Sequence, residues 1–243
     1  MRTLVIGDIH GGFKGLEQAL KRAKINPDDH LIFLGDYVDG WSESAETVDF
    51  LIELSKTQPT TFIRGNHDDL CHKWIAQGEM PQLWVQQGGL STIESYKKTG
   101  LKKAETHLPF YEKLVSYHID KENRLFIHAG FQNQKGPWHE YYETTPYWDR
   151  TLWELALAVD KNLDPDNKFY PERLKIFEEI YLGHTPVTRI GKTTPVKAAT
   201  IWNVDTGAAF KGPVTIMDIL TKEFWQSDPV WMLYPTERGR NVY

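Results

Sequence analysis

The sequence predicts an α/β fold in which short buried strands alternate with helices. Several apolar runs show no alternation of apolar and polar residues, which is typical of strands buried on both faces. Segments with helical periodicity separate these runs in the first part of the chain. The 243 residues, 40% hydrophobic and 13% aromatic, suffice for a single domain spanning residues 1–243.

The first 66 residues predict parallel βαβ units. The apolar runs "TLVIGD", "LIFLGD" and "TFIRGN" read as strands. Between them, "GFKGLEQALKRAK" and "ESAETVDFLIELSK" place apolar residues at helical spacing. The order strand, helix, strand, helix, strand is typical of a parallel sheet with helical crossovers.

The later segments are more varied. Residues 68–117 predict mostly helix, and "SYHIDKENRLFIHA" predicts a hairpin that turns at "DKEN". "TIWNVDTGAAFKGPVTIMDIL" predicts late strands with a glycine-rich turn. Residues 132–172 are rich in Trp, Tyr, Pro and acidic residues, so we expect an insertion of loop and short helix there.

Composition and charge indicate which classes of partner and which cell compartment to expect. The net charge of −5 disfavours a nucleic-acid binder with a broad basic face. No apolar run approaches the roughly 18 residues of a membrane span. The single cysteine, Cys71, excludes an intrachain disulfide. We therefore expect a cytoplasmic monomer with no nucleic-acid or membrane partner.

Polar side chains follow five of the apolar runs, where a strand of an α/β sheet delivers side chains to a cleft. A lone histidine at a strand end is more often structural, but the number of such groups favours a metal site. Carboxylate, imidazole and amide donors together suit Mn²⁺, Zn²⁺ or Fe²⁺, and fit Ca²⁺ poorly. The candidate ligands are Asp8, His10, Asp36, Asn66, His128 and His184.

Six ligands are too many for one tetrahedral ion and match two ions that share a bridging carboxylate. Two ions roughly 3.5 to 4 Å apart, with a hydroxide between them, are a recurring solution for the hydrolysis of phosphate esters. The sequence therefore indicates a dinuclear hydrolytic site.

The motifs around these ligands resemble those of a known family. "GDIHGG", "GDYVDG", "GNHD", "HAG" and "GHT" lie between residues 7 and 185. Their order and spacing are similar to those of the calcineurin-like metallophosphoesterase superfamily, in particular its serine/threonine phosphoprotein phosphatase branch with small bacterial and phage members. The resemblance implies a β-sandwich of two mixed sheets flanked by helices, of which the βαβ units above cover only the first half.

The resemblance also implies residue roles. His67 would be the general acid that protonates the leaving oxygen, and Asp39 would orient its imidazole and favour the protonated form. Mn²⁺ is the expected metal, with Fe, Zn and Mg as alternatives. The six ligands would divide into Asp8 and His10 for the first ion, Asp36 as the bridge, and Asn66, His128 and His184 for the second.

One position departs from the family pattern. The phosphoprotein phosphatases have Gly-Asp-x-Val-Asp-Arg-Gly, whose arginine helps to bind phosphate, whereas this chain has Gly40 and Trp41. A charge-assisted hydrogen bond of about 1.5 to 3 kcal/mol is therefore missing. Arg150 lies where relatives place a second phosphate-binding arginine, and is the first candidate to replace it. Arg64 is the second, although it could instead serve packing or an ion pair.

These features predict a phosphatase that acts on phosphate monoesters, with a metal-bridging hydroxide as nucleophile. The expected type is a protein serine/threonine phosphatase, with a phosphorylated protein or a small phosphoester as substrate. A dinucleoside-tetraphosphate hydrolase is the enzymatic alternative, because that group shares "HAG" and "DTG" and the aromatic segment 138–153 could stack adenine. A phosphoprotein-binding pseudophosphatase is an alternative of another class, disfavoured by the complete ligand set.

Overall fold

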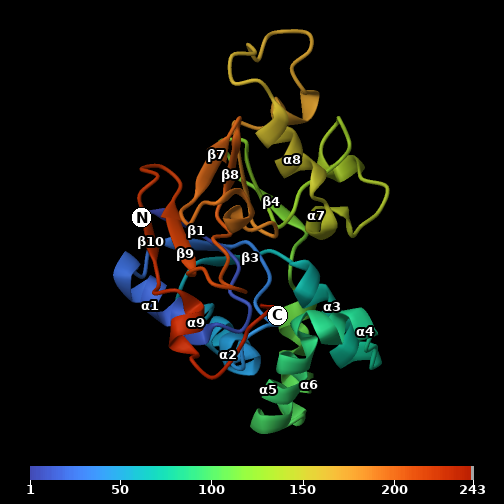
Figure 1. Ribbon diagram of the computed structural model, residues 1–243, viewed down its shortest axis with the longest axis vertical. Helices are drawn as coiled ribbons and strands as arrows, with labels where there is room; N and C mark the ends of the chain where they lie inside the picture. Colours follow the sequence, from blue (N-terminus) through green and yellow to red (C-terminus); the bar gives the residue numbers. More distant parts are fainter. Residues whose placement is uncertain (242–243) are drawn as a thin grey trace.

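The computed structural model describes residues 1–241 and contains two five-stranded mixed sheets (Figure 1). The first sheet has the order β10 (Phe224–Gln226), β9 (Thr215–Asp218), β1 (Thr3–Ile6), β2 (His30–Phe33) and β3 (Thr60–Phe62). The second has the order β4 (Tyr117–Ile119), β5 (Arg124–Ile127), β6 (Glu179–Leu182), β8 (Ile201–Asn203) and β7 (Val196–Ala198). The expected fold of two mixed sheets is confirmed.

Each sheet has a parallel set of three strands with antiparallel neighbours. In the first sheet β1, β2 and β3 are parallel, β9 runs antiparallel to β1, and β10 runs antiparallel to β9. In the second sheet β5, β6 and β8 are parallel, while β4 and β7 are antiparallel edge strands. The predicted βαβ units thus form the parallel part of the first sheet.

The apolar runs are continuous because both faces of these strands are buried. On β1, Leu4 and Ile6 pack against the helices, whereas Val5 faces the second sheet. On β6, Tyr181 faces the first sheet. Alternate side chains of a strand point to opposite faces, so a strand between two apolar layers needs apolar residues throughout.

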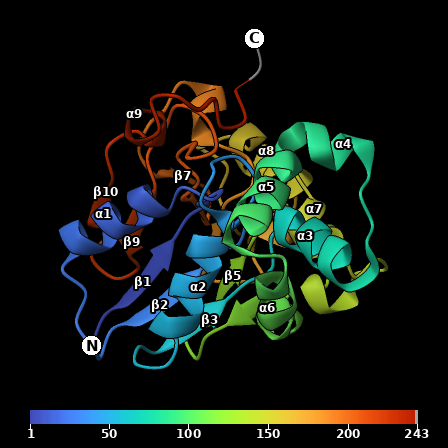
Figure 2. The same cartoon turned by 90° about the horizontal axis from the view of Figure 1, so that it is seen from below.

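Helices cover the outer faces of both sheets. Figure 2 shows α2 in front of the strands of the first sheet, with α1 and α6 to either side, and side chains of all three helices share one core with that sheet. The helices before residue 113 are α1 (Phe13–Ala23), α2 (Ser44–Leu54), α3 (Asn66–Gln77), α4 (Gln82–Trp84), α5 (Leu90–Thr99) and α6 (Lys102–Glu112). The later ones are α7 (Thr145–Trp148), α8 (Thr151–Ala158) and α9 (Val230–Leu233), and single turns occur at η1 (Val85–Gly89), η2 (Pro137–His139), η3 (Glu172–Leu174) and η4 (Val187–Ile190).

The structure of the later segments can be compared with the elements predicted from the sequence. The hairpin predicted at "DKEN" is the antiparallel pair β4 and β5. Residues 132–172 contain α7, α8, the single turn η2 and loops, and Figure 1 shows α7 and α8 beside the second sheet. The late strands β8 and β9 belong to different sheets, so the glycine-rich segment between them crosses from one sheet to the other.

The carboxyl ends of the parallel strands set the place of the candidate site. The chain leaves β1, β2 and β3 of one sheet, and β5 and β6 of the other, immediately before the candidate ligands. Among residues 1–241, no helix has the length and apolar character needed to cross a membrane.

Candidate metal centre

The six candidate ligands converge although they come from both sheets. All are buried, with exposed fractions of 8% or less. Asp8 and His10 follow β1, Asp36 follows β2, and Asn66 begins α3 directly after β3. His128 follows β5 and His184 follows β6.

Asp36 lies at the middle of the cluster. Its Oδ2 is 3.5 Å from Nε2 of His10 and 3.4 Å from Nε2 of His128. On the first side, Nε2 of His10 is also 3.7 Å from Oδ2 of Asp8. On the second side, Nε2 of His128 is 3.3 Å from Oδ1 of Asn66. One carboxylate therefore touches two groups of donors, as a bridging ligand requires.

The histidine tautomers leave lone pairs directed into the cluster. Nδ1 of His10 is 2.8 Å from the carbonyl of Asp39, and Nδ1 of His128 is 2.8 Å from the carbonyl of Leu34. A carbonyl can only accept, so each Nδ1 carries the proton and each Nε2 is free to bind a cation. Nδ1 of His184 faces Nε2 of His128 at 3.2 Å, and Nε2 of His184 has no hydrogen-bond partner among the described residues.

The backbone is unusual at the same positions. His10, Asp36, Asp39 and His184 all have positive φ angles, between 54° and 71°. This left-handed conformation is uncommon for residues other than glycine, and it is found where surrounding structure forces it, often at functional sites. The sharp turns aim successive side chains of each loop into the cluster.

The buried carboxylates of the cluster raise the pKa values of neighbouring groups, so they favour bound protons or cations. Burial alone would lower the pKa of His128, but the charges of Asp36 and Asp8 outweigh it and raise the pKa to about 9. Burial and then the charge of Asp8 raise the pKa of Asp205 to about 8. A buried group of carboxylates draws in protons or cations, and the mixed nitrogen and oxygen donors suit divalent transition metals.

His67 and Asp39 form a pair at the edge of this cluster. Nδ1 of His67 is 2.7 Å from Oδ2 of Asp39, which is completely buried. The same carboxylate accepts hydrogen bonds from Nε1 of Trp84 at 2.6 Å and from Oγ1 of Thr92 at 2.6 Å. The structure thus brings Asp39 and His67 together, and the orienting role of Asp39 stays a prediction.

The structure adds a second possible role for His67. Ligand atoms of His10, Asp36 and His67 lie within 4.8 Å of one another, so these three could together hold a metal. A second such group is Asp36, His128 and His184. Burial lowers the pKa of His67, and the carboxylates of Asp36 and Asp39 oppose that shift. Its role as general acid therefore stays a prediction.

The two candidate phosphate-binding arginines differ in their surroundings. Nη1 of Arg150 donates to Oγ1 of Thr185 at 2.7 Å and is 3.5 Å from the carbonyl of His184, so Arg150 borders the cluster. Arg64 is turned to a different environment, where Nη2 donates to the carbonyl of Tyr111 at 2.9 Å and Nη1 is 3.4 Å from Asp69. These contacts match the ion-pair alternative for Arg64.

Several residues around the cluster escape the sequence analysis. Trp84 and Thr92 lie in the helical region, where no motif marks them as partners of Asp39. Asp68 lies in the first turn of α3. Its carboxylate accepts from the amide of Gly65 at 2.8 Å, and also from the amide of Asp36 at 2.7 Å. It therefore fixes the loop that carries Asp36, the predicted bridging ligand.

Comparison with known families agrees with this geometry. Residues 1–208 match the model of a family described as calcineurin-like phosphoesterase. This chain is a calcineurin-like phosphoesterase. Members of this family depend on metal, and the phosphoesterase described here contains matching groups of candidate ligands.

The phosphoesterase is similar to curated proteins of two activities. It is 25% identical over 232 residues to serine/threonine-protein phosphatase 1 of Salmonella typhimurium, covering 88% of this chain and 90% of that protein. It is 27% identical over 234 residues to an asymmetrical bis(5'-nucleosyl)-tetraphosphatase of Bacillus cereus, covering 88% of this chain and 89% of that protein. The relatives establish a hydrolase of phosphoesters and divide over the substrate.

Solved structures share the fold. A serine/threonine phosphatase of Saccharomyces cerevisiae has a TM-score of 0.62 at 15% identity, with 94% of this chain and 80% of that chain covered. A metallophosphoesterase from Sphaerobacter thermophilus has a TM-score of 0.57 at 17% identity, with 94% of this chain and 89% of that chain covered. At these identities the likeness concerns the fold alone.

Proposed function

We propose that this phosphoesterase hydrolyses phosphate monoesters and acts as a protein serine/threonine phosphatase. The observation that carries the proposal is that two features occur at one site. Asp36 lies between two groups of donor atoms, and the imidazole of His67 is hydrogen-bonded to Asp39. The first feature suits two divalent ions and the second suits proton transfer.

The chain's own residues have distinct tasks in this proposal. The six buried ligands hold two ions, which when bound supply Lewis-acid stabilisation and a water of lowered pKa. Nδ1 of His67 is engaged by Asp39, so Nε2 is the nitrogen that delivers a proton to the leaving alkoxide. Arg150 meets the charge of the phosphoryl oxygens through its guanidinium.

Mn²⁺ is the proposed metal, because the site mixes imidazole with carboxylate and amide donors. The proposed setting is the cytoplasm, with a monomeric chain whose lone Cys71 is buried and donates to the hydroxyl of Tyr111 at 3.3 Å. Elemental analysis of the purified protein and its elution volume on a calibrated sizing column test the metal and the oligomeric state.

A dinucleoside-tetraphosphate hydrolase is the second candidate. A relative carries that name, and the 132–172 segment exposes large aromatic side chains that could stack on adenine. Tyr141 and Tyr142 are 88% and 67% exposed, and their rings meet edge to face at 4.8 Å.

A turnover panel distinguishes the two substrates. Metal-loaded protein of known metal content is assayed on phosphoserine and phosphothreonine peptides and on diadenosine tetraphosphate. The proposal predicts a higher kcat/KM on the peptides. A higher kcat/KM on diadenosine tetraphosphate, lowered by removing Tyr141 and Tyr142, would establish the second candidate instead.

A further inference from the structure

The space beside Gly40 is filled by a residue from the far end of the chain. A Cβ placed on Gly40 would lie 3.4 Å from Cγ of Arg240, and one placed on Gly88 would lie 3.2 Å from the same atom. Gly40 also has a φ of +137°, which side chains rarely tolerate. The stem of Arg240 thus packs over two glycines, one of them at the position where phosphoprotein phosphatases have arginine.

One nitrogen of the Arg240 guanidinium, Nε, is buried without a hydrogen-bond acceptor among the described residues. The backbone amide of Arg240 donates to the carbonyl of Ala209 at 2.8 Å. The Cζ of Arg240 lies 5.6 Å from the centre of the Phe210 ring. A buried donor without an acceptor is costly, so this arrangement favours an anionic ligand at the guanidinium.

The charge of Arg240 reaches the candidate metal centre. Gly40 directly follows Asp39, which orients His67. Burial is the main reason that the pKa values of His67 and Arg150 are lowered, and the positive charge of Arg240 adds to both shifts. Arg240, whose stem lies beside Gly40, is therefore a second positive charge near the candidate metal centre, in addition to Arg150.

Trp41 anchors the segment that carries Arg240. Its ring stacks on Tyr234 at 5.4 Å, and its Nε1 donates to the carbonyl of Ala208 at 2.8 Å. The backbone of Gly239 lies so close to this ring that a Cβ there would be 2.6 Å from Cζ2 of Trp41. The change from Arg-Gly to Gly-Trp at positions 40 and 41 therefore both clears space and builds a support for the C-terminal segment.

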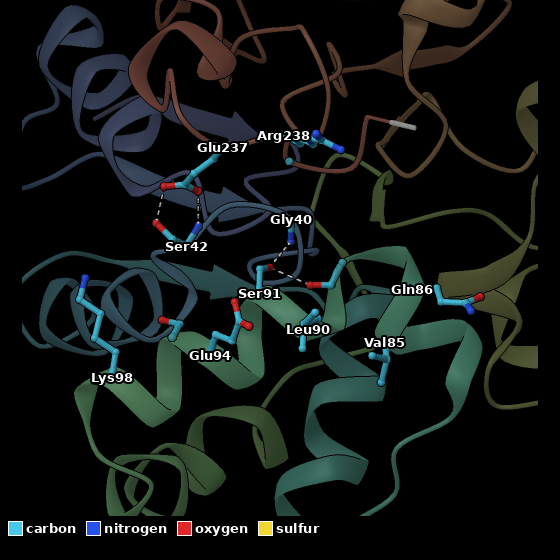
Figure 3. Close-up of a pocket in the computed structure, with 13 residues that line it drawn as sticks. Gly40, Ser42, Val85, Gln86, Leu90, Ser91, Glu94, Lys98, Glu237 and Arg238 are labelled. Carbon is cyan, nitrogen blue, oxygen red and sulfur yellow. Dashed lines mark hydrogen bonds between the residues drawn. The ribbon is translucent and has the colours of Figure 1, made fainter. Parts of the chain in front are cut away.

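A second anchor is visible in Figure 3, where the carboxylate of Glu237 faces Ser42. It accepts from the amide of Ser42 at 2.9 Å and from its hydroxyl at 2.7 Å. Glu237 and Ser42 both line a cavity of about 790 Å³, and residues of α5 line it as well. The segment is thus fixed from the Trp41 and Ser42 side.

We propose that Arg240, brought in by the C-terminal segment, binds the substrate phosphate in place of the arginine that position 40 lacks. This proposal rests on the phosphomonoesterase function above, because the anion that it assigns to Arg240 is the phosphate of that substrate. Arg240 and Arg150 together would meet the phosphoryl charge that the family meets with an arginine in the "GDYVDG" loop.

The test is binding of inorganic phosphate to metal-loaded protein, measured by calorimetry beside kcat/KM and metal content. Arg240→Met keeps the apolar stem and removes the charge. We expect it to weaken phosphate binding and lower kcat/KM by about 10- to 150-fold, the range for one charged hydrogen bond, with metal content unchanged. Arg240→Lys should recover little, because an ammonium cannot reproduce the guanidinium fork.

Arg238→Ala is the matched control, since it removes an arginine from the same segment and should change both quantities by less than threefold. A change below threefold in Arg240→Met would overturn the proposal and leave Arg240 as a packing residue. Failure of the proposed function is a separate result, namely a wild-type protein that turns over no phosphomonoester. Phosphate binding would still report on Arg240 in that case.

Discussion

Replacement of His67 by alanine separates proton transfer from metal binding. His67 could act in either role. It lies close enough to His10 and Asp36 to be a metal ligand, and its Nδ1 is 2.7 Å from Oδ2 of Asp39, as in a positioned general acid. If His67 is the general acid, His67→Ala should lower kcat by about 10²- to 10⁴-fold on a phosphoserine peptide. That loss corresponds to roughly 2.7 to 5.4 kcal/mol in the activation free energy.

The fold should tolerate this change. Asp39 keeps its hydrogen bonds from Trp84 and Thr92, and the amide of His67 keeps its bond to Asp36 at 3.0 Å. We therefore expect a loss of about 1 to 3 kcal/mol in the free energy of unfolding, as for one buried hydrogen bond. Chemical denaturation measures that quantity independently of turnover.

The assay compares two leaving groups. An aryl phosphate releases a stable phenolate and needs little help from an acid, so its kcat should fall much less than that of phosphoserine. Metal content, measured by elemental mass spectrometry, should remain at the wild-type value. Equal losses on both substrates, together with a lost ion, would show that His67 is a ligand and refute the assignment.

Two further changes probe the surroundings of the centre. Arg150→Ala should lower kcat/KM on a small phosphomonoester by about 10- to 150-fold and weaken inhibition by phosphate, with Arg150→Lys recovering little. Arg64→Ala is the comparison, and an effect on kcat/KM larger than that of Arg150→Ala would move the phosphate contact to Arg64. Asp68→Ala removes the acceptor for the Asp36 amide and should weaken metal affinity by about 10- to 100-fold, seen in metal titrations. Unchanged affinity would mean that the loop holds its shape without Asp68.

Much of the first sheet could be predicted because its information is local. The runs around Val5 and Ile32 are continuous and apolar, and each ends in a glycine and a polar residue, so strand type and direction follow from the pattern. The short edge strands β7 and β10 carry no such pattern, because an edge strand needs burial on fewer sides. The pairing of the late strands into different sheets depends on long-range packing that no local window contains.

The candidate site divides in the same way. Its candidate ligands lie in motifs of contiguous residues, so their residue types and spacing identify them in the sequence. The residues that support them are held by tertiary contacts between distant segments. Trp84 contacts Asp39 although the two residues are 45 positions apart in the sequence, and Arg240 packs beside Gly40 from the far end of the chain. Neither lies in a motif, so neither could be found without the folded chain.

The central claim is that Asp36 joins two metal ions in one hydrolytic centre. The most direct measurement is the ratio of metal to protein in the wild type and in Asp36→Asn, taken with turnover on the same samples. We expect two divalent ions per chain in the active wild type, loss of both ions and of activity on chelation, and weakened occupancy of both sites in Asp36→Asn. Full turnover by protein stripped of metal, or two tightly held ions in Asp36→Asn, would contradict the account.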